Sequence, residues 1–443
     1  MTARTLYRNA RLLDPSRHLD VQGNLLVLDG RIVDAGAHVF VDAVQDDARV
    51  VDCTGLCLAP GLIDMRVTSG EPGNDHLETL ATLSHAAAAG GVTTVVCLPN
   101  TAPVIDDVAL LHFIERRAAD TALVSILSYA AATRGTEGVQ MSEIGLLHTA
   151  GAQGFTDGAR TIGNARVMRQ LLGYATAFGA MVIQHAELPD LVGDGVMNEG
   201  ETATRLGLAG IPAEAEVMMV ERDLRLVAMT GGRYHVSRVS TGATLDAISG
   251  AKAAGLPVTC DTAPPYFALA EDAVHDYRTF SKLSPPLRSD ADRRAVLAGI
   301  ADGTIDAIVS DHCPRDQDSK RLPFDQAAHG AVGLETLLVI TLEAVHNGSL
   351  DMLPALSCLT CTPARILGLE TGTLAPGSPA DLVIFDADSA GRVDAAKFHS
   401  KCKNSPFDGR PVQGRVVKTI RGGCLIYDAL DGGVRHARTR RDA

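Results

Sequence analysis

Apolar residues in the middle of the chain come in short, β-branched runs, and most of these runs precede a segment of helical periodicity. The apolar runs cover residues 61–67, 92–98, 122–127, 152–155, 180–183, 234–239, 256–260 and 305–309. The helical segments cover residues 78–89, 108–118, 165–178, 213–229, 243–254, 290–301 and 334–345. Eight such runs, most of them followed by a helical segment, predict an α/β fold of the (β/α)8 TIM-barrel type. No GxGxxG motif follows the first run, which argues against a doubly wound open sheet.

The two ends of the chain have a different pattern, of strands and hairpins. Residues 25–28 and 31–33 flank Asp29-Gly30, a dipeptide typical of a type I′ hairpin turn. Strand-like runs near the C-terminus cover residues 381–385, 414–420 and 424–427. Each end is too short to bury a core alone, so we expect both to fold together into one small β-sandwich.

These patterns predict two domains. A split β-sandwich would take residues 1–55 and 368–443, and the barrel would take residues 56–367. Residues 436–443 are interpreted as a solvated tail, with a basic binding arm as the alternative.

Composition narrows the class of protein without naming a function. The chain has 443 residues and a formal net charge of −13, which argues against nucleic acid or an anionic membrane as partner. Aromatic residues make up 4%, with no Trp, so a base-stacking platform is not expected. The nine cysteines have no framework spacing, and the first residues lack the apolar run of a signal peptide. We therefore expect a protein of the reducing cytoplasm.

Polar side chains follow most of the predicted barrel strands, where a barrel of this type carries its chemistry. The residues at these strand ends are Asp64, Arg66, Thr68, Asn100, Asp157, His185, Glu187, Arg238 and Asp311. Side chains alternate along a strand, so Asp64, Arg66 and Thr68 share one face.

Several motifs make a family resemblance specific. They are Pro60-Gly-Leu-Ile-Asp64, Glu71-Pro-Gly73, residues 86–101 with LeuProAsnThr at their end, Ser284-ProProLeuArgSer, residues 302–312 ending ValSerAspHis, and Gly333-LeuGluThr. With these motifs the chain resembles dihydroorotase, a cyclic amidohydrolase of pyrimidine synthesis, almost from end to end. The resemblance implies a metal-dependent hydrolase barrel with a split β-sandwich, which agrees with the pattern above.

The resemblance also implies a zinc site, and only half of its ligand set is present. The family places a His-x-His pair after strand one, single histidines after strands five and six, a bridging Asp after strand four, and a metal-binding, proton-shuttling Asp after strand eight. The positions that match are Asp157, His185 and Asp311, whereas the lost ligand positions hold Arg66, Thr68 and Arg238. Among the substrate-binding positions, Asn100 matches, whereas Gly70, Ser284 and Arg315 stand in place of an Arg, an Asn and a His.

Arginine cannot replace a zinc ligand. Its guanidinium stays protonated and has no lone pair to offer a cation. His235 and His312 lie out of phase with Arg238 and Asp311, and His76 lies at a helix start, so no neighbouring histidine replaces the lost ones. We therefore expect a degenerate metal site with no resident cofactor.

Each surviving residue also has a structural interpretation. Asp157 and Asp311 would be buried carboxylates paired with Arg66, Arg238 or Arg315, because a buried carboxylate needs a partner. His185 would be a hydrogen-bonded barrel residue and Asn100 a turn residue or a substrate contact. The three arginines together are an alternative site for an anion such as a carboxylate or phosphate.

Two hypotheses of different classes follow. In the first, the chain is non-catalytic, Asp311 is a vestigial general base, and the resemblance implies an oligomeric role as structural or regulatory partner of aspartate carbamoyltransferase. In the second, it is an active cyclic amidohydrolase with one zinc on Asp157, His185 and Glu187, with Asp311 as general base and Asn100 as substrate contact.

Overall fold

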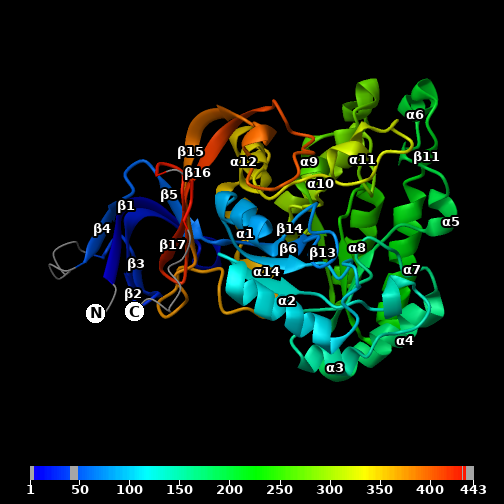
Figure 1. The fold of residues 1–443 in the computed structure, drawn as a ribbon, viewed down its shortest axis with the longest axis horizontal. Helices are drawn as coiled ribbons and strands as arrows, with labels where there is room; N and C mark the ends of the chain where they lie inside the picture. The colour runs from blue at the N-terminus through cyan, green and yellow to red at the C-terminus, as the bar shows by residue number, and fades with distance from the viewer. Residues whose placement is uncertain (1–3, 40–47, 432, 436–443) are drawn as a thin grey trace.

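Both ends of the chain meet in one nine-stranded sheet in the computed structural model, which describes residues 4–39, 48–431 and 433–435 (Figure 1). β1 (Arg4–Asp14) pairs in parallel with β5 (Cys57–Pro60), and β5 pairs antiparallel with β15 (Leu382–Arg392). The other strands of this sheet are β2 (Leu19–Leu28), β3 (Arg31–Gly36), β4 (Arg49–Asp52), β16 (Pro411–Arg421), β17 (Cys424–Asp428) and β18 (Gly433–Val434). The prediction of a strand-rich unit built from both chain ends is confirmed.

The turn between β2 and β3 confirms the predicted hairpin. Asp29 and Gly30 have φ angles of 49° and 77°, the two positive values that a type I′ turn requires. The domain boundaries at residues 55 and 367 stay a prediction, and the predicted tail at residues 436–443 lies outside the described residues.

β15 joins the sheet to the barrel because both of its faces are buried. Leu382 and Ile384 belong to the core of the sheet, whereas Val383 and Phe385 belong to the core shared with the barrel. This period of two means that one strand contributes to both hydrophobic cores.

The barrel follows the predicted order of strands. They are β6 (Leu62–Val67), β7 (Val92–Cys97), β8 (Ser125–Ser128), β9 (Met181–His185), β12 (Arg233–Ser237), β13 (Val258–Thr262) and β14 (Ala307–Ile308). β6, β7 and β8 pair in parallel, as do β9, β12, β13 and β14. The ring closes where Val67 forms a parallel bridge with His312.

The fourth predicted strand, residues 152–155, is not a strand. Only Phe155 takes part, through isolated parallel bridges to Ala130 and Val182. A turn at Gly151 and another at Asp157-Gly158 leave too few residues between them for a ladder. The segment still fills the gap between β8 and β9, so the (β/α)8 arrangement is retained.

The predicted helices surround the barrel. The long ones are α1 (Leu80–Ala89), α2 (Val108–Thr121), α4 (Ala165–Ala175), α7 (Glu214–Thr230), α8 (Gly242–Ala253), α10 (Asp290–Ala301) and α12 (Leu337–His346). Shorter helices are α3 (Ile144–Thr149), α5 (Pro189–Val192), α6 (Glu201–Leu206), α9 (Pro264–Ala268), α11 (Gln317–Arg321), α13 (Met352–Ser357) and α14 (Cys361–Leu367). In the described ranges, no helix has the length and apolar character needed to cross a membrane.

Candidate functional site

Two arginines and one aspartate meet at the carboxyl ends of the barrel strands. Arg66 lies in β6, Arg238 directly follows β12, and Asp311 follows β14. Arg66 Nε lies 2.9 Å from Asp311 Oδ1, and Arg238 Nη1 lies 3.3 Å from Asp311 Oδ2. The three side chains are 3%, 7% and 12% exposed, so these ion pairs are largely withdrawn from water.

Other guanidinium nitrogens of Arg66 and Arg238 have further acceptors, whereas Arg238 Nε is buried without a partner among the described residues. Arg66 donates to Ser237 Oγ at 3.3 Å and to the Gly158 carbonyl at 3.2 Å. Arg238 Nη1 donates to the Ser284 carbonyl. Burial lowers the pKa of Arg238 and the Asp311 carboxylate raises it, with a net rise. The two cations are therefore held as structural charges by this protein's own acceptors.

His185, at the end of β9, has both ring nitrogens engaged. Arg238 Nη2 lies 2.8 Å from Nδ1, and since arginine only donates, Nδ1 is the acceptor. Nε2 then carries the proton and lies 2.8 Å from Glu187 Oε2 and 3.0 Å from Ser284 Oγ. Burial and the nearby Arg238 lower the pKa of His185, which agrees with a neutral ring. No lone pair of this histidine is free for a metal.

Asp157 forms no ion pair with an arginine in the part of the chain that the structure describes, so that expectation is wrong. Its carboxylate accepts from the backbone N–H of Thr133 at 2.9 Å and from Thr133 Oγ1 at 2.5 Å. Burial raises the pKa of Asp157 despite these bonds. The partner was missed because Thr133 lies in a loop with no distinguishing sequence signal.

Asn100 holds the turn that contains Asp157. Its Nδ2 donates to the Asp157 carbonyl at 3.0 Å, and its Oδ1 accepts from the Ala159 N–H at 3.1 Å. Both ends of the amide are thereby occupied within the protein, which favours the turn interpretation over a substrate contact.

Other candidate residues lie outside the cluster. Arg315 Nε donates to the His329 carbonyl at 2.8 Å, so the three arginines do not converge on one anion site. The Thr68 backbone N–H donates to the His312 carbonyl at 2.8 Å, which is part of the barrel closure.

The neighbouring histidines do not supply the missing ligands. His312 Nε2 lies 3.4 Å from Glu78 Oε2, and its Nδ1 accepts from a backbone N–H. His235 Nε2 lies 2.9 Å from Asp261 Oδ2, and its Nδ1 lies 2.8 Å from Thr259 Oγ1. Both are committed to other carboxylates, as the strand alternation predicts.

Position 70 cannot carry a substrate-binding side chain in this backbone. Gly70 has a φ of +74°, and a Cβ there would lie 2.6 Å from the Glu78 carbonyl oxygen and 2.8 Å from that of Asn74. Both clashing atoms are backbone, so no side-chain movement would relieve them. The loop after β6 is therefore built around a glycine.

The space beside Asp311 is small. A cavity of about 10 Å³ reaches Asp311 and is closed by Pro264, Leu283 and Phe407, among others. That volume is at the lower limit for one water molecule.

The residues present do not fit a zinc ion. Zinc needs neutral imidazole and carboxylate donors with a free position. Here two guanidiniums hold Asp311, and one of them also takes the His185 lone pair. A bound Zn²⁺ would meet two positive charges where it needs ligands.

Comparisons with known proteins agree on the protein family that this chain resembles. Residues 55–244 match the dihydro-orotase-like family and residues 341–427 the amidohydrolase family. A dihydroorotase of Citrifermentans bemidjiense is 43% identical over 96% of this chain and 99% of its own. A dihydroorotase of Wolbachia from Drosophila simulans is 44% identical over 95% of each chain.

Solved structures give the same fold. The L-hydantoinase of Arthrobacter aurescens superposes with a TM-score of 0.87 at 26% identity, over 96% of both chains. The dihydropyrimidinase of Brevibacillus agri superposes with a TM-score of 0.81 at 23% identity, over 96% of this chain and 95% of its own. The latter likeness concerns the fold alone.

Proposed function

The chain belongs to the dihydroorotase-like family of amidohydrolases, and from that premise we propose that it is a non-catalytic member with a degenerate metal site. The observation that carries the proposal is the buried cluster in which Arg66 and Arg238 share Asp311. Asp311, a vestigial general base, pairs with two cations there instead of serving a metal.

Electrostatics supports this proposal. A zinc ion could reach Asp311 and His185 only by displacing both guanidiniums. Removing one partner of a buried ion pair costs about 3–5 kcal/mol, because the other charge is left without compensation. The displaced cations would still lie close to the metal and repel it.

Substrate binding is also disfavoured by the site. Gly70 cannot be replaced by a cationic clamp without rebuilding its loop. The proposal therefore rests on the missing substrate-binding side chain at position 70 as well as on the missing metal ligands.

We propose further that the chain acts in the cytoplasm, within pyrimidine biosynthesis, as a structural or regulatory partner of aspartate carbamoyltransferase. The support is the sequence resemblance to degenerate dihydroorotase-like chains with this role. Co-expression of the two proteins followed by size-exclusion chromatography tests it. We expect one co-eluting hetero-oligomer; separate elution at all tested concentrations would contradict the partnership.

The alternative is an active zinc-dependent dihydroorotase or related cyclic amidohydrolase. It is favoured by the relatives at 43–44% identity, which are dihydroorotases. It would have to use Asp157, His185 and Glu187 as ligands, although Thr133 and Arg238 already occupy the first two.

A ring-opening assay separates the two functions. Purified protein is incubated with dihydroorotate and with dihydrouracil, each in the presence of added Zn²⁺, and amide loss is followed in the ultraviolet. We expect no turnover above the protein-free reaction. Turnover that a chelator abolishes would overturn the non-catalytic proposal.

A further inference from the structure

A second cavity, of about 420 Å³, lies beside α11 and carries an unusual concentration of positive charge. The cationic residues that line it are Arg278, Arg315, Lys320, Arg321 and Lys403. Its volume is within the range of small-molecule sites. It shares no lining residue with the Asp311 cluster, so the inference is independent of the proposed function.

The charges of this cavity are not neutralised by the protein. Across residues 4–39, 48–431 and 433–435, none of the five cations forms an ion pair with a carboxylate. Asp316 is the lining carboxylate, and its Oδ1 accepts the Ser319 N–H at 2.7 Å at the start of α11. The cavity thus has a local excess of positive charge in a chain whose net charge is −13, and such a local field attracts anions.

Three of the basic side chains are held in place by backbone carbonyls; of these, Lys320 is buried, which disfavours its charge, so the attraction for an anion comes from the other four. Lys320 Nζ donates to the carbonyls of Thr279 at 3.0 Å and Ala328 at 2.6 Å. Lys403 Nζ donates to the Ser400 carbonyl at 2.7 Å. Arg315 uses only its Nε for the bond to the His329 carbonyl, which leaves its terminal nitrogens available.

The other two cations are exposed. Among the described residues, Arg278 and Arg321 have no side-chain hydrogen bond, so both are available to a ligand. A cavity with fixed cations in its wall and free guanidiniums at its edge suits a phosphate group, which accepts several charge-assisted bonds.

Aromatic residues complete the lining. Tyr277 lies in η5 (Glu271–Tyr277) and Phe280 in η6 (Thr279–Ser281), and both line the cavity. The Tyr277 hydroxyl donates to the Leu206 carbonyl at 2.9 Å, which fixes the ring although it is 48% exposed. Such rings offer a face for a flat ligand ring, to which arginine adds cation–π attraction.

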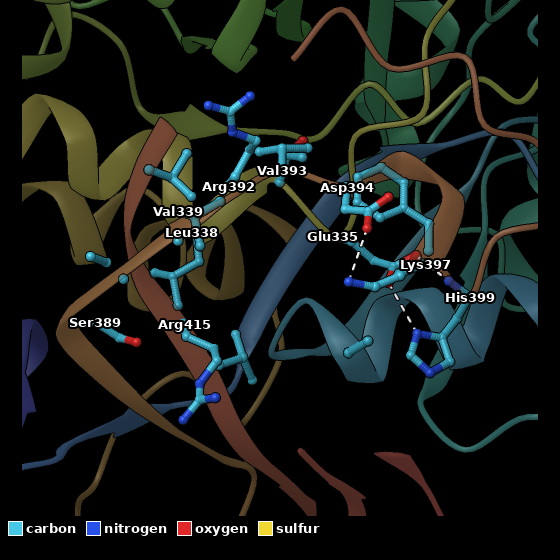
Figure 2. Close-up of a pocket in the computed structure, with 18 of the residues that line it drawn as sticks. Glu335, Leu338, Val339, Ser389, Arg392, Val393, Asp394, Lys397, His399 and Arg415 are labelled. Carbon is cyan, nitrogen blue, oxygen red and sulfur yellow. Dashed lines mark hydrogen bonds and ion pairs between the residues drawn. The ribbon is translucent and has the colours of Figure 1, made fainter. Parts of the chain in front are cut away.

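A cavity of similar size elsewhere has a smaller excess of basic side chains. Figure 2 shows a cavity of about 430 Å³ lined by α12, β15 and β16. There Glu335 lies 3.0 Å from the His399 ring and Asp394 lies 3.0 Å from Lys397, so both acids pair with a neighbouring base (Figure 2). Arg392 and Arg415 also line this cavity and form no ion pair among the described residues, so the two cavities differ in the excess of basic over acidic lining residues and not in the mere presence of unpaired cations.

We propose that the cavity beside α11 binds a small phosphorylated molecule that carries a flat ring, such as a nucleoside monophosphate. The phosphate would contact Arg278, Arg321 and the terminal nitrogens of Arg315, and the ring would lie against Tyr277 or Phe280.

Isothermal titration calorimetry of the full chain in phosphate-free buffer tests this site. The probes are adenosine 5′-monophosphate, uridine 5′-monophosphate, the two uncharged nucleosides and inorganic phosphate. We expect saturable binding of at least one nucleotide, with no binding of the nucleosides and weaker binding of inorganic phosphate. The variants Arg278→Gln and Arg321→Gln should each weaken nucleotide binding about tenfold, as expected for loss of one charge-assisted contact.

Arg169→Gln, on the exposed face of α4, is the matched control and should leave the affinity unchanged. Absence of binding by both nucleotides would overturn the proposal. Equal binding of inorganic phosphate and the nucleotides would overturn it as stated, because the ring would then contribute nothing. Equal weakening by Arg169→Gln would show that the attraction is not specific to this cavity. Because the altered arginines are exposed, unchanged melting temperatures should accompany the affinity losses.

Discussion

At the scale of single residues, the candidate site is a cluster of ion pairs at the carboxyl ends of the barrel strands. Arg238 and Asp311 both have left-handed backbones, with φ angles of 62° and 48°. Such conformations cost free energy in non-glycine residues and persist where surrounding contacts determine them. Here the contact between these two side chains is itself part of that surrounding structure.

Asp311→Asn should destabilise the barrel. It would leave Arg66 and Arg238 buried without a compensating charge, at a cost of about 3–5 kcal/mol. Urea unfolding followed by circular dichroism measures the change. Asp20→Asn breaks an exposed pair with Arg11 and serves as control, with little loss expected. A wild-type midpoint for Asp311→Asn would show that the carboxylate is not structural.

Restoring the lost ligand positions should create zinc affinity without activity. The combined variant Arg66→His, Thr68→His and Arg238→His removes both guanidiniums and frees Asp311 and the His185 lone pair. We expect zinc binding by calorimetry and no dihydroorotate turnover, because Gly70 still excludes a substrate clamp. The control variant Arg66→Met and Arg238→Met should not bind zinc. If the histidine variant folds but fails to bind zinc, the absence of these three ligands does not explain the loss of the metal site.

At the scale of elements, the loop after β6 depends on Gly70. Its φ of +74° is readily adopted by glycine but not by other residues. A Cβ at this position would lie 2.6 and 2.8 Å from two backbone carbonyl oxygens, which leaves no room for it. The loop thus differs in backbone, and not only in side chains, from one that holds a substrate-binding arginine.

Gly70→Ala should cost more stability than Gly55→Ala. Gly55 has a similar φ of +78° but nothing within 4 Å of a Cβ, so its replacement measures the conformational strain alone. That strain is about 1–2 kcal/mol, and the excess at Gly70 reports the steric overlap. Denaturant unfolding of both variants gives the comparison; equal losses would mean that the loop adapts.

α11 carries a buried lysine whose charge is disfavoured. Burial lowers the pKa of Lys320 to about 7, from an ordinary value of 10.5. The unfolded chain therefore binds more protons than the folded chain between these two pH values, and stability must rise with pH in that window.

Lys320→Met should remove this dependence. Between about pH 7 and pH 9 the wild type should gain on the order of 1 kcal/mol per pH unit over the variant. Thermal melts in phosphate-free buffer measure the difference. Lys397→Met, at a lysine that is 83% exposed, should show no such trend. A parallel pH profile of wild type and Lys320→Met would contradict a lowered pKa.

The elements were largely predictable from their periodicity, whereas the partners within the site were not. The helix expected at residues 290–301 is α10, Asp290–Ala301, because its cap and apolar spacing are local properties. The pairing of Asp311 with Arg66 and Arg238 followed from strand-end topology. The pairing of Asp157 with Thr133 did not, because it depends on how a loop folds back over the barrel.

At the scale of the whole molecule, two local groups of positive charge contrast with the negative net charge. The net charge is −13, yet the barrel mouth holds two buried arginines and the cavity beside α11 holds five cations. The two buried arginines lie at the ends of barrel strands, where this fold supports chemistry. Four of the five basic residues of the cavity lie on segments that follow β13 or β14, whereas Lys403 follows β15 of the nine-stranded sheet. The account assigns the first group to structure and the second to a ligand.

Zinc stoichiometry of the wild-type chain tests the central claim most directly. Protein purified without chelators and dialysed against Zn²⁺, then against metal-free buffer, is measured by inductively coupled plasma mass spectrometry. The account predicts no retained zinc, because Arg66 and Arg238 occupy Asp311 and the His185 lone pair. Stoichiometric zinc, lost in Asp311→Asn and His185→Asn variants that remain folded, would contradict it.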